Sequence, residues 1–255
     1  AAEMVRGDYV MLCDHDDLLA EDALFEMVKA LNEDPSIDII YTDEDLVNSD
    51  TTVFSDPRCK PDFNFDFLRS INYICHIFMV RKGILDETGY LREEYDGAQD
   101  YDLILRCCEK TDKIHHIPKI LYHWRAHENS TAGNPESKTY AIEAGKKALE
   151  EHYRRMGIEA KVEYTDIFIM FCTIMKVQGS PRVSIIIPSQ DHVKDLDKCI
   201  TSIEEKSTWD NYEILVVENN SRRKETFQYY EDIQKQYENV KVVFWKKEFN
   251  YSAIN

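Results

Sequence analysis

Three short apolar segments, separated by two amphipathic segments, fill the C-terminal part of the chain and restrict its fold more than any other feature. The apolar segments are Val183–Pro188, Tyr212–Val217 and Val240–Trp245. Nearly continuous apolar strands are typical of a parallel sheet that is covered on both faces. The resulting β-α-β-α-β order predicts half of a nucleotide-binding α/β sheet, whose ligands lie at the carboxyl ends of the strands.

A second α/β pattern opens the sequence. We expect a buried strand over residues 8–13, an acidic loop, an amphipathic helix over residues 20–32, and another strand over residues 37–42. The helix is expected to turn one apolar stripe toward the core, formed by Leu24, Met27, Val28 and Leu31.

The acidic loop Cys13-Asp14-His15-Asp16-Asp17 directly follows the first of these strands. Asp14 and Asp16 point the same way if the strand geometry continues. Oxygen-rich sites of this kind suit Mg²⁺ or Mn²⁺, which often contact substrate phosphates. A solvated acidic turn is the alternative. An EF-hand is excluded, because Leu19 and Phe25 stand where its loop needs Gly and Glu.

The formal net charge of −17 restricts the partners of the chain. It argues against a nucleic-acid partner and against broad attachment to an anionic membrane surface, because both need clustered Lys and Arg. A metal held by carboxylates would supply the positive charge that an anionic substrate requires. The longest apolar run, residues 167–175, is shorter than the ~20 residues of a membrane-spanning helix. Seven scattered cysteines predict reduced thiols in a cytoplasmic protein.

Several motifs along the chain occur in a recognisable order, namely residues 7–19, Tyr41-Thr42-Asp43-Glu44-Asp45, Lys60-Pro61-Asp62-Phe63, Gly97-Ala98-Gln99-Asp100-Tyr101-Asp102-Leu103, Tyr122-His123-Trp124-Arg125-Ala126-His127, residues 183–188 and Glu218-Asn219-Asn220-Ser221. With these motifs the sequence resembles the family 2 glycosyltransferases of the GT-A fold. That fold is a Rossmann-like α/β fold with a mixed sheet, which binds nucleotide-diphospho-sugars. The sequence is particularly similar to large bacterial enzymes that build rhamnose-containing and O-antigen polysaccharides, often with tandem transferase domains.

The resemblance implies roles for the acids and their neighbours. Asp14 and Asp16 match the D-x-D motif, which holds the metal and the sugar nucleotide, and Asp17 matches the acid that often follows and binds substrate. Asp100 matches the general base that deprotonates the acceptor hydroxyl, and Gln99 beside it is assigned to substrate binding. A plain helix N-cap is the alternative role for Asp100, at the start of a helix over residues 100–110.

The resemblance also implies that a basic segment near residue 125 lies close to the diphosphate of the donor. Arg125 and Trp124 are assigned to substrate binding there, and His127 is expected to complete the metal shell. Asp43 and Asp45 either line the donor or acceptor pocket or form a solvated turn. A zinc site formed by histidines is the alternative interpretation of this region, although zinc motifs have tighter spacing. Its ligands would be His115, His116, His123 and His127.

Four residues of the C-terminal part are candidate nucleotide contacts, namely Pro188, Asp191, Glu218 and Asn220. Asp191 and Glu218 are candidates for contacts with the base and the ribose. The sequence departs from the family here, because Ser189-Gln190-Asp191 replaces Thr or Asn followed by an aromatic residue. Glu218-Asn219-Asn220-Ser221 likewise replaces Asp-Asp-Gly-Ser. These departures leave the base of the donor open between uridine and thymidine.

The order of the motifs also predicts the domain organisation. A complete domain of this family begins with the elements that come last here. We therefore expect residues 1–134 to be the catalytic half of one GT-A domain, residues 135–182 a helix with connecting strands, and residues 183–255 the nucleotide-binding half of the next domain. Two architectures stay open: one circularly permuted domain, or two half-domains with exposed sheet edges.

The sequence thus predicts a metal-dependent inverting glycosyltransferase of cell-surface polysaccharide synthesis. Its donor would be a UDP- or dTDP-linked sugar. Its acceptor would be a glycan, lipid-linked at the inner face of the membrane, with peripheral membrane association through the parent protein. One alternative is a module that binds a nucleotide sugar or glycan without turnover, and another is a fragment that does not fold alone. Nicotinamide or ATP chemistry has no anchor, because neither a Gly-x-Gly-x-x-Gly nor a P-loop lysine motif is present.

Overall fold

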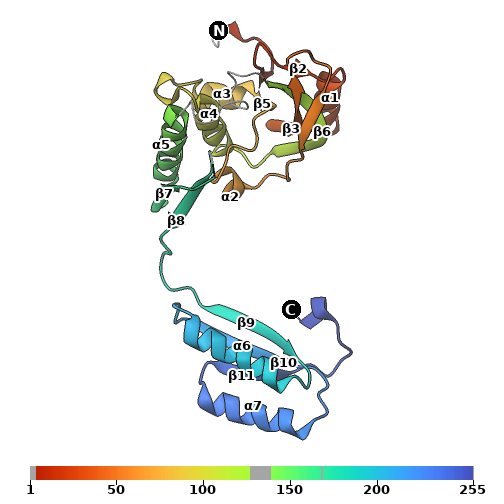
Figure 1. Ribbon diagram of the computed structural model, residues 1–255, viewed down its shortest axis with the longest axis vertical. Coiled ribbons are helices and arrows are strands. Elements are labelled where there is room, and N and C mark those ends of the chain that lie inside the picture. Colours follow the sequence, from red (N-terminus) through yellow and green to blue (C-terminus); the bar gives the residue numbers. More distant parts are fainter. Residues whose placement is uncertain (1–3, 127–138, 168, 255) are drawn as a thin grey trace. The chain divides into compact units, whose positions relative to one another are not determined.

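The computed structural model describes residues 4–126, 139–167 and 169–254, and it divides the chain into two compact units (Figure 1). The first unit comprises residues 1–176 and the second residues 177–255. Each has its own hydrophobic core. The proposed metal ligand His127 lies outside the described residues.

A mixed six-stranded sheet forms the centre of the N-terminal unit. Its order is β1-β5-β3-β6-β2, with β4 pairing on β3. The pair β3 and β6 is parallel, whereas the other pairs are antiparallel. The strands are β1 (Tyr9–Leu12), β2 (Leu18–Leu19), β3 (Ile39–Asn48), β4 (Phe54–Arg58), β5 (Phe78–Arg81) and β6 (Ile114–Ala126).

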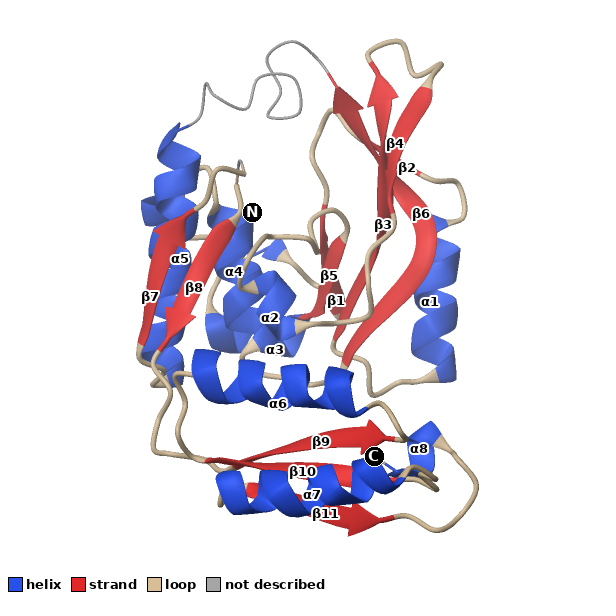
Figure 2. Cartoon of the chain, turned by 60° about the horizontal axis from the view of Figure 1, so that its bottom comes forward, coloured by secondary structure: helices blue, strands red, loops and turns tan. Residues whose placement is uncertain are grey.

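The sheet separates two cores, as Figure 2 shows by the helices on its two sides. On β3, Ile40 faces the core beneath α1, whereas Ile39 and Tyr41 face the core that contains α4 and α5. This alternation follows from the two-residue repeat of a strand with both faces covered. The helices are α1 (Ala23–Glu33), α2 (Phe65–Leu68), α3 (Lys82–Thr88), the 3-10 turn η2 (Glu93–Tyr95), α4 (Gln99–Cys108) and α5 (Thr139–Met156).

The segment after residue 139 packs onto the N-terminal unit. Helix α5 contributes Ala148, Leu149 and Tyr153 to the larger core. A hairpin follows, in which β7 (Ala160–Tyr164) pairs antiparallel with β8 (Phe171–Met175). The backbone N–H of Phe171 donates to the carbonyl of Ser70 at 2.8 Å, so the hairpin is fixed to the body of the unit.

The structure corrects three local predictions in this unit. In α1, Leu24 and Val28 are exposed, because the helix buries Ala23, Met27 and Ala30 instead, and the two alanines permit a close approach to the sheet. The strand expected to end at residue 42 continues to Asn48, so residues 43–45 are buried in β3 and form no solvated turn. Helix α4 has Ala98 as its N-cap, which places Asp100 within the first turn.

The C-terminal unit confirms the predicted β-α-β-α-β order. Its strands β9 (Val183–Ser189), β10 (Tyr212–Glu218) and β11 (Val240–Phe244) form a parallel sheet in the order β11-β10-β9. Helices α6 (Val193–Lys206) and α7 (Lys224–Gln236) share its core, and the short α8 (Tyr251–Ile254) follows. No helix in the described part of the chain is long and apolar enough to span a membrane.

Candidate functional site

The acidic loop after β1 is held in place by Tyr122, a fully buried residue of β6. The Tyr122 hydroxyl donates to Asp17 Oδ2 at 2.5 Å and accepts from the Asp14 backbone N–H at 3.2 Å. Burial and the bond to Asp17 raise the pKa of Tyr122, so it remains a neutral donor. One side chain therefore connects Asp14 and Asp17 of the loop to the central sheet.

Arg125 holds the same loop from the end of β6. Its backbone N–H donates to Asp17 Oδ1 at 2.8 Å, and its Nε donates to the carbonyl of Asp16 at 2.5 Å. A further donor, Nη1, binds the carbonyl of Ser49 at 2.7 Å. The side chain predicted to lie near the diphosphate is thus bound to backbone carbonyls on two loops.

His76 joins the acidic loop from the segment before β5. Its Nε2 lies 3.5 Å from Asp14 Oδ2, and its ring stacks on Tyr122 with the centroids 4.8 Å apart. Burial lowers the pKa of His76, but the nearby carboxylates of Asp14 and Glu44 outweigh it and leave that pKa above its ordinary value. Sequence reasoning missed His76, because only the pairing of β1 with β5 brings it to the acidic loop.

Three side chains meet as a candidate cation site: Asp14, Asp17 and His76. One ligand atom from each lies within 4.8 Å of the other two. Two carboxylates and an imidazole form a donor set that suits a divalent cation such as Mn²⁺. Within residues 4–126, 139–167 and 169–254 this is the one such group of acids, histidines and cysteines. The Asp16 side chain is 36% exposed and does not belong to this group.

A cavity of about 570 Å³ adjoins this group and extends to the start of α4. Its lining includes Asp14, His76, Trp124 and two residues of α4, Gln99 and Asp100. The cavity therefore connects the acidic loop with the predicted general base, although these residues are far apart in the sequence. Trp124 and Gln99, both predicted to bind substrate, lie on its wall.

Asp100 points its carboxylate toward Asn72. The amide Nδ2 of Asn72 donates to Asp100 Oδ2 at 3.1 Å, whereas the buried Oδ1 of Asn72 has no hydrogen-bond partner among the described residues. Both residues line the cavity. The Asn72 amide therefore orients one oxygen of the Asp100 carboxylate. The side chain of Gln99 accepts from the backbone N–H of Gly97 at 2.7 Å.

The two other acids assigned to substrate binding pair with histidines of the neighbouring strand. Asp43 Oδ1 lies 2.9 Å from His116 Nε2 and accepts from the Lys60 backbone N–H at 2.8 Å. Asp45 Oδ1 lies 2.6 Å from His123 Nδ1. Both acids are buried and neither lines the cavity. Because His116 and His123 face separate carboxylates, the described histidines do not converge on a zinc site.

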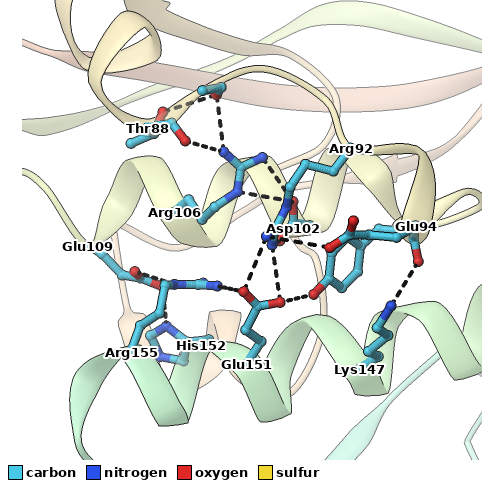
Figure 3. Close-up of polar contacts among 12 residues, drawn as sticks. Thr88, Arg92, Glu94, Asp102, Arg106, Glu109, Lys147, Glu151, His152 and Arg155 are labelled. Atoms are coloured by element: carbon cyan, nitrogen blue, oxygen red, sulfur yellow. Dashed lines mark hydrogen bonds and ion pairs between the residues drawn. The ribbon is translucent and has the colours of Figure 1, made fainter.

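The first turn of α4 is held by a buried ion network (Figure 3). Asp102 is fully buried and accepts from Arg92 Nε at 3.0 Å and from Arg106 Nη2 at 2.8 Å. Arg92 also binds Glu151 of α5, with Nη1 and Oε1 3.1 Å apart. The turn that carries Asp100 is therefore fixed to α5, a role for Asp102 that sequence reasoning did not assign.

The candidate nucleotide contacts gather at the carboxyl ends of β9 and β10. Asp191 Oδ1 accepts from the backbone N–H of Arg223 and from Thr226 Oγ1, each at 3.0 Å. The backbone N–H of Arg223 lowers the pKa of Asp191. Glu218 is buried and accepts from the Tyr230 hydroxyl at 2.7 Å. Both acids therefore organise this edge of the sheet.

Two further candidates lie at the same edge. Pro188 is in β9, opposite Val217 of β10. Asn220 follows β10 with φ of +60°, and its Nδ2 donates to the carbonyl of Lys247 at 2.9 Å. The four predicted nucleotide contacts thus come from one edge, as expected for ligands of a parallel sheet.

Comparison with known proteins gives two family matches. Residues 1–134, just over half of the chain, match the model described as glycosyltransferase-like family 2, and residues 184–254 match glycosyl transferase family 2. The mixed sheet with its covering helices and these matches confirm the predicted GT-A-like fold of nucleotide-sugar transferases.

Similar curated proteins come from bacteria. A Sinorhizobium fredii protein described as uncharacterized is 42% identical over 258 residues, covering 100% of this chain and 28% of the relative. The O-antigen biosynthesis protein RfbC of Myxococcus xanthus is 38% identical over 252 residues, covering 98% and 19%. A chondroitin synthase of Pasteurella multocida is 27% identical over 132 residues, covering 52% and 14%. The chain thus spans less than a third of the length of each of these relatives.

Proposed function

Because the chain belongs to glycosyltransferase family 2, we propose that its N-terminal unit transfers a sugar from a nucleoside diphosphate to a glycan acceptor, with inversion at the anomeric carbon. The similarity to an O-antigen biosynthesis protein supports a polysaccharide as the product. We extend this proposal to a UDP- or dTDP-linked donor and to a lipid-linked acceptor at the inner face of the membrane.

The observation that carries the proposal is the shared cavity. Asp14 and His76 line one part of it, and Asp100 lines another. A transferase needs both a group that stabilises the departing diphosphate and a base that activates the acceptor, close to the same carbon atom. The cavity brings the two kinds of side chain together.

The donor set fits a divalent cation, which we propose to be Mn²⁺ or Mg²⁺ held by Asp14, Asp17 and His76. When bound, the cation would neutralise negative charge on the diphosphate. Tyr122 and Arg125 would keep the two carboxylates in position, since both hold the loop by hydrogen bonds.

Asp100 is the proposed base. Its carboxylate would accept the proton of the acceptor hydroxyl as that oxygen forms a bond to the anomeric carbon. At the same time the bond between that carbon and the diphosphate oxygen breaks, and the diphosphate leaves with the bonding electrons. Asn72 would hold the Asp100 carboxylate in place during this step, because its Nδ2 donates to Asp100 Oδ2 and both residues line the cavity.

The proposal is tested by separating binding from turnover. We would measure UDP and dTDP binding by calorimetry with and without Mn²⁺, and sugar transfer from a panel of UDP- and dTDP-sugars to oligosaccharides. Asp100→Asn should lower the turnover rate by about 10²- to 10⁴-fold and leave the nucleotide Kd unchanged. Asp96→Asn is the matched control, because Asp96 is exposed and does not line the cavity.

Two outcomes would contradict this assignment. Full transfer activity in Asp100→Asn would remove Asp100 from the role of base. Metal-dependent nucleotide binding without any product would favour the alternative, a module that binds the nucleotide sugar without turnover.

A further inference from the structure

Glu44 is the centre of a cluster of three charged side chains beside the cavity. Strands β3 and β4 pair Glu44 with Arg58, and Arg58 Nη1 lies 3.1 Å from Glu44 Oε1. Lys60 Nζ lies 3.2 Å from Glu44 Oε2. The cluster holds two positive charges and one negative charge, so it carries a net positive charge in a chain whose total charge is −17.

The two cations of this cluster differ in their surroundings. The Lys60 side chain is 5% exposed, and its ammonium also donates to the carbonyls of Ile74 at 3.0 Å and His76 at 2.5 Å. Lys60 therefore balances Glu44 and uses all three of its donors inside the protein. The Arg58 side chain is 47% exposed and lines the cavity together with Asp14 and His76.

Arg58 also keeps hydrogen-bonding capacity for a ligand. Its one hydrogen bond to the described residues runs from Nη1 to Glu44, which leaves Nε and Nη2 without partners there. The guanidinium carbon lies 5.2 Å from the ring centroid of Trp124, another cavity residue, and this contact restricts the orientation of the side chain. A planar guanidinium held in this way is suited to bind phosphate oxygens with two hydrogen bonds.

We infer that Arg58 binds the diphosphate of the sugar-nucleotide donor. This inference rests on the proposed function, since it assigns a residue to the anionic part of that donor. Arg58 is the only lysine or arginine among the described residues that line the cavity, whereas the carboxylates of Asp14 and Asp100 repel an anion. Arg125, by contrast, does not line the cavity, and its Nε and Nη1 donate to the carbonyls of Asp16 and Ser49. Arg58 therefore supplies the cationic side chain of the site.

The experiment measures anion affinity in the full chain by calorimetry with Mn²⁺ present, using UDP, inorganic pyrophosphate and glucuronate as probes. Arg58→Gln should raise the Kd of UDP and of pyrophosphate by roughly tenfold or more, the usual effect of losing a charge-assisted hydrogen bond. Arg58→Lys should recover part of the affinity. Arg182→Gln is the matched control, because Arg182 is also half exposed and bonded to a strand glutamate, Glu213. It should change neither Kd.

The Kd of Mn²⁺ alone separates direct binding from a structural disturbance. Arg58→Gln should leave it within about twofold of wild type, whereas displacement of the segment around His76 would weaken it. Unchanged affinity for UDP and pyrophosphate would overturn the inference, as would a loss confined to glucuronate, which would assign Arg58 to an acidic acceptor. If the wild-type chain binds no UDP, the proposed function itself fails and the inference falls with it.

Discussion

His76 Nε2 lies 3.5 Å from Asp14 Oδ2, although His76 precedes β5 and Asp14 follows β1. The two residues meet because β1 and β5 pair antiparallel, with Leu12 opposite Phe78. The C-terminal end of β1 and the N-terminal end of β5 therefore lie side by side, at the same end of this strand pair. Asp17 completes the group, held there by the hydroxyl of Tyr122.

The candidate cation site predicts that Asp17 matters more than Asp16 for metal binding. We expect Asp17→Asn and His76→Phe to raise the Kd of Mn²⁺ by roughly tenfold or more, because each removes one ligand atom. His76→Phe keeps a ring to stack on Tyr122. Asp16→Asn should change the Kd by less than about threefold. Calorimetric titration after treatment with EDTA gives the Kd of wild type and of the three variants. A larger effect at Asp16 than at Asp17 would contradict this prediction and support the D-x-D assignment of Asp14 and Asp16.

The network around Asp102 predicts a large loss of stability when it is broken. Asp102→Ala should lower the free energy of unfolding by about 3–5 kcal/mol, because Arg106 would keep a buried charge without its partner. Lys110→Ala is the control, since its ion pair with Glu87 is largely exposed and should contribute little to stability. Urea denaturation measures both values. Equal effects would show that the Asp102 network does not stabilise α4.

The buried pair of Lys60 and Glu44 predicts non-additive effects on stability. Lys60→Met should lower the free energy of unfolding by about 3 kcal/mol, because the Glu44 carboxylate and two carbonyl groups lose a donor. The double variant with Glu44→Gln should lose less than the sum of the single variants, since the partners are in contact. A double-mutant cycle by urea denaturation measures the coupling, and strict additivity would contradict it.

Asp191 predicts that the stability of the C-terminal unit depends on pH. Hydrogen bonds from the backbone N–H groups of Arg223 and Arg222 hold the folded-state pKa of Asp191 below its ordinary value of 3.8. The ionised carboxylate thus stabilises the fold above that value, and the contribution is lost as the pH falls through the folded-state pKa. Wild type should exceed Asp191→Asn in stability at about pH 7, and this advantage should be smaller at about pH 2, below the ordinary pKa of the carboxyl. Urea denaturation at both values tests this, and a constant difference would contradict it.

Much of the fold could be predicted from the sequence. In the C-terminal unit, the apolar runs at Val183–Pro188 and Tyr212–Val217 became adjacent parallel strands, because the periodicity of apolar residues is a local property that sequence shows directly. The stripe of α1 was harder to predict. Its apolar residues lie on more than one face, and only contact with the sheet decided that Met27 is buried and Val28 exposed.

The family and the acidic loop were also accessible from sequence, since the motif order around Asp14 and Asp100 is local information. The partners of these residues were not. His76 reaches Asp14 through the pairing of β1 with β5, and Arg58 reaches Glu44 through the register of β3 with β4. The sequence determined which segments form helices and strands and which residue types each motif offers, because these properties depend on neighbours along the chain. The tertiary structure alone decided which side chains share the cavity, because strand pairing and register join residues that sequence keeps apart.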